Sequence, residues 1–206
     1  MFSPNISIFS SRRGLTSKLC FLFILISSSI GFAQTIQFSE DSIPVINDEV
    51  VFSVKFNHEL NKEDFFIRTS FYLNDELEPH SGSFITNNKD SAICRITDYL
   101  DIESSFLITY AMYITYNIHL TYEDGYCNMT IKDITYMEKG DFETQEESQR
   151  QQDMERYSGK DIMIDENYTW LTKRKASKII TKATIERINE IIKDLDLAFA
   201  TENQYN

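Results

Sequence analysis

The chain has 206 residues, of which 42% are hydrophobic and 25% are charged, and its formal net charge is −12 at pH 7. This composition is that of an ordinary globular domain and excludes a disordered or fibrous chain. Because affinity for nucleic acids depends on Lys and Arg side chains that neutralise phosphates, so acidic a chain is also a poor candidate for binding DNA or RNA.

The first 33 residues have the pattern of a secretory signal peptide. Three basic residues precede an apolar run at residues 19–26, and small residues then lead to a cleavage site between Ala33 and Gln34. An uncleaved amino-terminal anchor is the alternative, but the apolar stretch of about 15 residues is shorter than the ~20 that span a bilayer. We therefore expect an exported protein of the periplasm or cell envelope, whose mature chain starts at Gln34 and has no integral membrane segment.

The next residues predict a strand and a helix. Apolar and polar residues alternate over residues 50–57, which is typical of a half-buried strand. Asn61 then has the chemistry of a helix cap, and we predict a helix from this residue to about Leu77. The spacing i, i+4, i+7 predicts that its buried face consists of Phe66, Ser70, Leu73 and Leu77. Two short strands are predicted to follow, at residues 82–86 and 91–97.

A long hairpin is predicted at residues 107–136. Its turn is Asp124–Gly125, the pair that favours a two-residue type I′ connection. This turn predicts the cross-strand pairs Glu123–Tyr126, Tyr122–Cys127, Leu120–Met129 and Ile118–Ile131, which place the apolar residues of both strands on one face. The other face is polar enough to meet water, so we expect a sheet with one covered face and one open face. The candidate binding residues on the open face are Tyr113, Asn117, His119, Tyr126 and Asn128.

Two cysteines, Cys94 and Cys127, are predicted on the covered face, where they could form the disulfide that is common in exported proteins. If the strands after Gly82 form a simple meander, however, the first strand of the hairpin lies between the strands that carry them. Their Cα atoms would then be roughly 9–10 Å apart, whereas a disulfide seldom spans more than ~7 Å. We therefore expect two buried free thiols.

Residues 138–161 are rich in Glu, Gln and Ser, which predicts a polar mobile segment or a solvated helix. A helical segment at residues 162–206 is expected to pack on the domain, with its main helix starting near Thr181 or Thr184. The apolar stripe of this helix is predicted to be Ile185, Ile188, Ile192, Leu195 and Phe199. Docking onto the core explains the stripe better than a coiled-coil partner, because the stripe covers only about two heptads. A basic run at residues 173–182 is interpreted as a solvated helix face.

The order strand, helix, four strands and helix predicts an α+β domain with an antiparallel sheet of about five strands and helices packed on one face. A family resemblance rests on four stretches, namely Pro44–Phe52, the helix start Asn61–Phe65, the turn Asn88–Asp90 and the hairpin stretch Tyr116–Tyr126. These stretches resemble an exported bacterial domain of unknown function that is described as having a TATA-binding-protein-like (TBP-like) fold. The resemblance covers residues 40–137 and implies that fold and an envelope location. It implies no activity, since the family has no assigned catalytic residues.

The sequence has no motif that marks a catalytic or metal site. The histidines, His58, His80 and His119, have no partner at metal-ligand spacing, and there is no nucleophile elbow or phosphate-binding glycine loop. We therefore expect no cofactor and no metal.

Three function classes follow from these observations. The favoured one is a non-catalytic envelope module that binds a partner protein or a small ligand. A hydrolase of unknown substrate is the alternative, and nucleic-acid binding, which only the name of the fold suggests, comes third. A deep pocket with convergent carboxylates, or a His beside a nucleophile, would favour the enzyme, whereas a flat polar sheet would favour the module.

Overall fold

The computed structural model describes residues 37–102, 110–144, 157–168 and 173–201. The signal peptide predicted at residues 1–33, with its cleavage site between Ala33 and Gln34, lies outside the described residues and stays a prediction. The described residues belong to one unit, which begins at Ile36. Within these ranges no helix is both long enough and apolar enough to cross a membrane.

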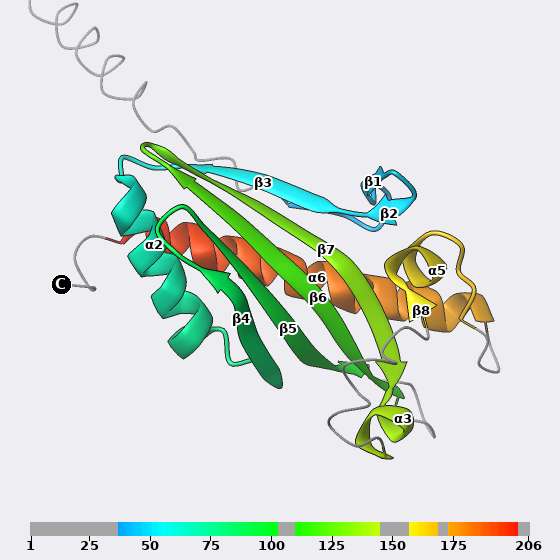
Figure 1. Ribbon diagram of the computed structural model, residues 1–206. Helices are drawn as coiled ribbons and strands as arrows, with labels where there is room; N and C mark the ends of the chain where they lie inside the picture. The colour runs from blue at the N-terminus through cyan, green and yellow to red at the C-terminus, as the bar shows by residue number, and fades with distance from the viewer. Residues whose placement is uncertain (1–36, 103–109, 145–156, 169–172, 202–206) are drawn as a thin grey trace, which may run out of the picture. The chain divides into compact units, whose positions relative to one another are not determined.

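An antiparallel sheet forms the centre of this unit (Figure 1). Its long strands are β3 (Phe52–Asn57), β4 (Ser81–Asn87), β5 (Ser91–Ile102), β6 (Tyr110–Glu123) and β7 (Tyr126–Glu138). They are hydrogen bonded in the order β3-β7-β6-β5-β4, so the predicted meander is confirmed and β3 joins its far side. The short strand β8 (Tyr157–Ser158) also pairs with β7, and β1 (Val45–Ile46) and β2 (Glu49–Val50) form a separate small hairpin.

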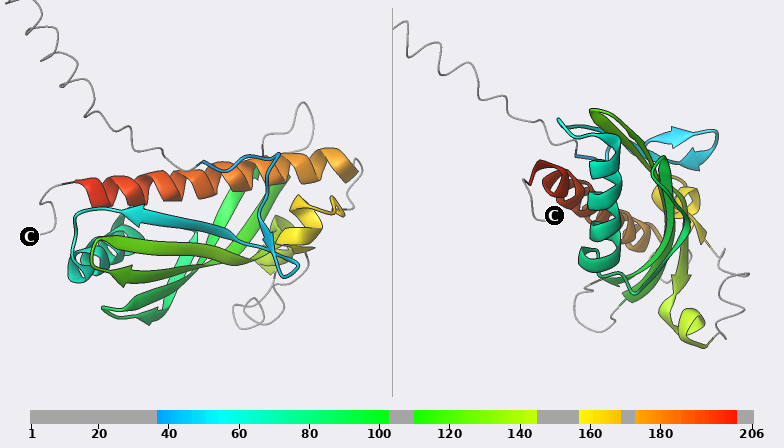
Figure 2. Two further views of the ribbon diagram at one scale, coloured as in Figure 1. Left: turned by 90° about the horizontal axis from the view of Figure 1, so that it is seen from above. Right: turned by 60° about the vertical axis from the view of Figure 1, so that its left-hand side comes forward.

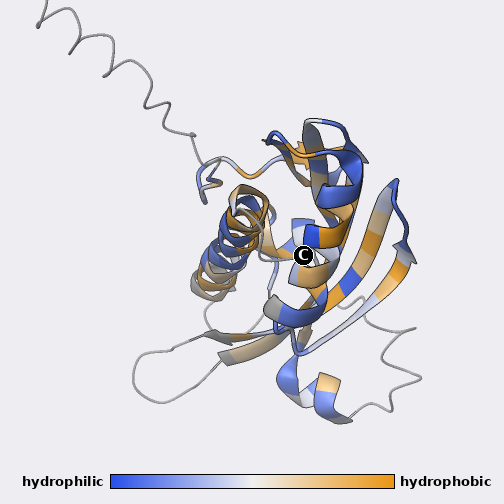
Figure 3. Cartoon of the chain, turned by 90° about the vertical axis from the view of Figure 1, so that its left-hand side faces the viewer, coloured by the Kyte–Doolittle hydropathy of each residue, from blue (hydrophilic) through white to orange (hydrophobic). Residues whose placement is uncertain are grey.

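Two helical segments cover one face of the sheet (Figure 2). They are α2 (Lys62–Phe71), which continues into the π-helical turn η1 (Tyr72–Glu76), and the long helix α6 (Lys173–Ala200). Hydrophobic and hydrophilic residues alternate along the strands (Figure 3), because successive side chains of a strand point to opposite faces. The predicted α+β arrangement, with helices packed on one face of an antiparallel sheet, is confirmed.

The β6–β7 hairpin has the predicted register, from Glu123 opposite Tyr126 to Ile118 opposite Ile131. Its turn is nevertheless not type I′, because only Gly125 has a positive φ, of 87°, whereas type I′ needs a positive φ at both central residues. The Gly125 N–H donates to the Leu60 carbonyl at 2.9 Å. The turn is therefore shaped by its contact with the connection between β3 and α2.

The buried face of α2 is displaced by one residue from the predicted one. Asn61 caps the helix as predicted, since its side chain accepts a hydrogen bond from the N–H of Asp64. The buried residues of α2 itself are Phe65 and Thr69, whereas Phe66 and Ser70 are half-buried. The π-helical turn η1 then shifts the helical register. Leu73 and Leu77 are buried as predicted.

The chain after β7 contains more regular structure than predicted. Both ends of the range 138–161 form elements, with α3 (Lys139–Thr144) at its start and β8 followed by α5 (Gly159–Met163) at its end. Helix α6 begins at Lys173, about two turns before Thr181. The predicted stripe of α6 is buried in the core, which confirms docking: Ile185, Ile188, Ile192, Leu195 and Phe199.

The two cysteines lie on the covered face with β6 between their strands. Cys94 is opposite Ile118 of β6, Cys127 is opposite Tyr122 of β6, and both are buried free thiols. Burial raises the pKa of Cys94 to about 11 and that of Cys127 to about 12. In the chain from Gln34 onward, a thiol reagent at about pH 8 should react with neither cysteine while the protein is folded. It should react with both after unfolding without reductant, and a count of zero at that stage would contradict the free-thiol assignment.

Helix α5 is held against the sheet through a glycine. A Cβ atom on Gly159 would lie 3.2 Å from Cβ of Ile134 and 3.4 Å from Cβ of Val50. Gly159→Val should therefore lower the free energy of unfolding by about 1–3 kcal/mol, measured as a lower urea midpoint. Gly140→Val in α3 is the matched control, since a Cβ atom there meets nothing within 4 Å. An equal loss in both variants would show that space at Gly159 is not the cause.

Candidate functional site

The predicted binding residues lie on the sheet face opposite α2 and α6, but in three different surroundings. Tyr113 is at the end of β6 near α3, and Asn117 and His119 are in the middle of the same strand. Tyr126 and Asn128 are on β7 near the β6–β7 turn. The structure therefore brings Asn117 and His119 together and separates them from the other three.

Tyr113 is covered, contrary to the prediction that it meets solvent. Helix α3 folds over this end of the sheet, and the ring of Phe142 stacks on the ring of Tyr113 with centroids 3.8 Å apart. Tyr113, Met137 and Phe142 form a small core of their own, and Tyr113 is only 5% exposed. The signal in the sequence is Phe142, an aromatic residue within the otherwise polar range 138–161 that is predicted to be mobile.

A β-bulge shapes the middle of the open face. The β6–β7 register shifts between Thr115 and Asn117, and Asp133 on β7 has a left-handed backbone conformation with a φ of 56°. The Nδ2 of Asn117 donates to Oδ2 of Asp133 at 2.7 Å. The N–H of Asp133 donates to Oε1 of Glu49 at 3.2 Å, which ties the bulge to the β1–β2 hairpin.

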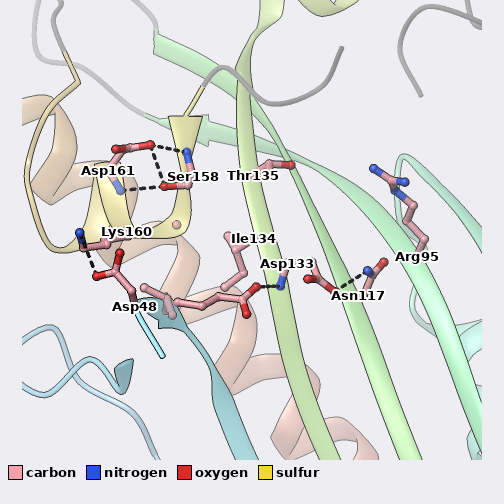
Figure 4. Close-up of a pocket in the computed structure, with 12 residues that line it drawn as sticks. Asp48, Arg95, Asn117, Asp133, Ile134, Thr135, Ser158, Lys160 and Asp161 are labelled. Carbon is pink, nitrogen blue, oxygen red and sulfur yellow. Dashed lines mark hydrogen bonds and ion pairs between the residues drawn. The ribbon is translucent and has the colours of Figure 1, made fainter. Parts of the chain in front are cut away.

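Beside the bulge the surface is hollowed into a pocket of about 590 Å³, which we call the bulge pocket (Figure 4). Its lining comes from the β1–β2 hairpin, β5, the β6–β7 pair and the β8–α5 segment. Several of its charged groups are already engaged. Nζ of Lys160 lies 3.1 Å from Oδ1 of Asp48, and Asp161 forms a capping box with Ser158 at the start of α5.

Arg95 differs from the other charged residues of the bulge pocket. It lies on β5 between Asn117 of β6 and Ser83 of β4, and it is partly exposed. Its guanidinium makes no ion pair or hydrogen bond within the described ranges, and Figure 4 shows it at the edge of the pocket, apart from the dashed contacts. A guanidinium presents its N–H donors in a planar fork that matches a carboxylate or phosphate. Arg95 is therefore a group with which the pocket can bind an anion.

The end of the open face near the β6–β7 turn is polar. Nζ of Lys55 on β3 lies 3.7 Å from the ring centroid of Tyr126, and Lys55 is the strand partner of Asn128. Next along the strands, the hydroxyls of Ser53 and Thr130 lie 3.3 Å apart. Tyr126 and Asn128 thus belong to a strand surface that is separate from the lining of the bulge pocket.

The contacts of the three histidines show whether the described residues include an activated nucleophile. His58 Nε2 lies 2.7 Å from Oδ1 of Asp196, and His80 packs its ring against aromatic side chains. His119 Nε2 lies 4.0 Å from Oδ2 of Asp133. In the described residues none of the three is hydrogen bonded to a hydroxyl or thiol, and no three His, Cys, Asp or Glu side chains are placed to hold a metal ion. The site described here can bind and orient a polar ligand, and it shows no activated nucleophile.

Two solved structures share this arrangement of helices and strands. A DUF4468 family protein from Bacteroides ovatus matches with a TM-score of 0.60, at 14% identity over 80% of this chain and 94% of that one. A TBP-like protein from Parabacteroides distasonis matches with a TM-score of 0.56, at 16% identity over 77% of this chain and 97% of that one. The chain has a TBP-like fold.

This result confirms the fold that the family resemblance implied. The low identity means that the likeness concerns the fold alone, so the function of the site depends on this chain's own side chains. No protein-family model and no curated protein sequence matches the chain.

His119, in the middle of the TBP-like sheet, has a pKa below its usual value. Burial is the main cause, Lys132 lowers the pKa further, and Asp133 opposes both. In an NMR titration, Lys132→Gln should therefore raise the midpoint of the imidazole and Asp133→Asn should lower it. Since the folded-state pKa lies below the unfolded one, the unfolded chain binds this proton first, and stability should be lost as the pH falls below about 6.5. A wild-type midpoint above about 6.5 would contradict this assignment.

Proposed function

We propose that this TBP-like protein is a non-catalytic binding module of the cell envelope, and that the bulge pocket takes a polar segment of a partner protein or a small polar ligand. The envelope location is supported by the signal-peptide pattern of residues 1–33 and by the family resemblance. The binding role is supported by the pocket itself, which has a volume in the range of ligand sites in proteins.

The observation that carries the proposal is the unpaired guanidinium of Arg95 at the edge of the bulge pocket. A ligand carboxylate can form two charge-assisted hydrogen bonds with such a group. The other charges of the pocket are mainly acidic, since its single lysine is outnumbered by Asp48, Glu49, Asp133 and Asp161. The ligand expected is therefore one that combines an anionic group for Arg95 with hydrogen-bond donors for these carboxylates.

The two other function classes have less support. A hydrolase would need a nucleophile beside a base, and the histidines of the described residues contact carboxylates and aromatic rings instead. Nucleic-acid binding would need a basic surface, whereas the chain carries a net charge of −12 and the bulge pocket holds four acidic residues.

A comparative pull-down tests the proposal. The chain from Gln34 onward is immobilised, exposed to an envelope extract of the host cell, and the retained material is identified by mass spectrometry. Recovery of the partner should fall about tenfold or more in Arg95→Gln, since a hydrogen bond to a charged group contributes about 1.5–3 kcal/mol.

Lys55→Gln is the matched control. It removes the same charge from the same sheet face, but Lys55 lies on β3 outside the lining of the bulge pocket. A partner retained by Lys55→Gln and lost by Arg95→Gln supports the pocket as the binding site. A partner lost equally from both variants indicates non-specific attraction, and one retained by Arg95→Gln shows that binding occurs elsewhere.

A further inference from the structure

A second hollow, of about 580 Å³, lies where α6, β5 and the connection from η1 to β4 meet, and we call it the α6 pocket. It shares no residue with the bulge pocket. Its charged lining is strongly acidic, because four carboxylates face a single guanidinium. These residues are Glu78, Asp98, Glu190, Asp194 and Arg187.

The guanidinium of Arg187 is fully engaged by the wall of the α6 pocket. Nε donates to Oδ2 of Asp98 at 2.9 Å, Nη1 donates to Oε2 of Glu190 at 2.6 Å, and Nη2 donates to the Leu77 carbonyl at 3.0 Å. Asp98 also accepts the hydroxyl of Tyr116 at 2.6 Å. Arg187 therefore has few N–H groups left for a ligand. Its single positive charge balances only part of the negative charge of Asp98 and Glu190.

The other two carboxylates of the α6 pocket are uncompensated. Within the described part of the chain, the side chains of Glu78 and Asp194 make no ion pair and no hydrogen bond. Two negative charges at one hollow repel each other, and a ligand with positive charge removes that repulsion. The α6 pocket thus attracts cations.

A buried tyrosine indicates that a ligand belongs there. Tyr72 is only 2% exposed and lines the α6 pocket, yet its hydroxyl has no hydrogen-bond partner in the ranges that the structure describes. Burial, then Asp194, raises the pKa of this phenol, and the other charged groups that act on it are Arg187, Glu190 and Asp98. The hydroxyl is not among the side-chain atoms that are fully closed off from solvent, so it is open to the pocket that Tyr72 lines. A ligand N–H in the pocket can therefore donate to it.

We propose that the α6 pocket binds a small aliphatic amine with two or more ammonium groups. The ammonium groups pair with Asp194 and Glu78, and one of them donates to the hydroxyl of Tyr72. The apolar side chains of Leu77 and Leu100, which also line the pocket, suit a methylene chain. A metal ion would need several ligands converging on one point, and no such group of three occurs among the described residues. The α6 pocket is separate from the bulge pocket, and amine binding there would be a function in addition to the proposed partner binding.

Calorimetric titration of the chain from Gln34 onward with putrescine, at low ionic strength, tests the proposal. Saturable binding of one putrescine per chain is expected. Tyr72→Phe removes only the hydroxyl, and Asp194→Asn removes only the charge, so both variants should keep the fold and its urea midpoint. Each should weaken binding by about fivefold or more.

Glu186→Gln is the matched control, because Glu186 lies on the same helix, is exposed and lies outside the lining of the α6 pocket. The affinity of Glu186→Gln for putrescine should stay within about twofold of the wild-type affinity, as expected of an exposed charge. Equal weakening by Glu186→Gln and Asp194→Asn would overturn the proposal, and so would the absence of saturable binding. Displacement of putrescine by an equal concentration of Mg²⁺ would point to a simple divalent site and overturn it. If the protein binds a trilysine peptide but does not bind putrescine, the proposal is overturned in favour of a peptide ligand.

Discussion

The structure depends on the burial of one apolar sheet face under two helical segments, of which α6 is the longer. Strands β5, β6 and β7 place their apolar residues on the same face, and α6 covers that face with its own apolar stripe. Apolar burial alone does not fix how the helix is rotated or where it sits along the sheet. Two polar contacts do so: Arg187 of α6 pairs with the buried Asp98 of β5, and the buried hydroxyls of Thr184 and Tyr136 lie 2.9 Å apart. A buried carboxylate without its partner would be strongly destabilising, so Asp98 requires the helix position that the structure shows.

The same strand serves two pockets of opposite character. Arg95 and Asp98 lie three residues apart on β5, and because side chains alternate along a strand, they point to opposite faces. Arg95 lines the bulge pocket on the open face, whereas Asp98 lines the α6 pocket on the helix side. The chain thus offers a free guanidinium on one face and uncompensated carboxylates on the other. Its acidic net charge would not by itself suggest that division.

Local chemistry explains which features could be predicted from the sequence. Asp124–Gly125 sets the hairpin register because a two-residue turn leaves one pairing that buries both apolar sets. The bulge at Asp133 and the π-helical turn at Tyr72–Glu76 were not predicted, since each shifts a periodicity by one residue without a distinctive residue type. The open face was predicted as a whole, but the cover that Phe142 forms over Tyr113 depends on a contact between separate elements. Both pockets depend on such contacts as well, so Asn117 was the only predicted candidate among their lining residues.

The position of β3 has a consequence for how the chain folds. Its partner strand β7 comes much later in the sequence, with Phe52 paired to Ile131, whereas β4 to β7 pair with their immediate neighbours along the chain. Local hairpins close small loops and form quickly, and long-range pairs form after them. We therefore expect the meander to form first and β3 to be added to its edge. A chain made from its amino terminus carries the apolar residues Phe52, Val54 and Phe56 without a partner until residue 131 has been synthesised. During that interval β3 is a segment through which unfinished chains can associate.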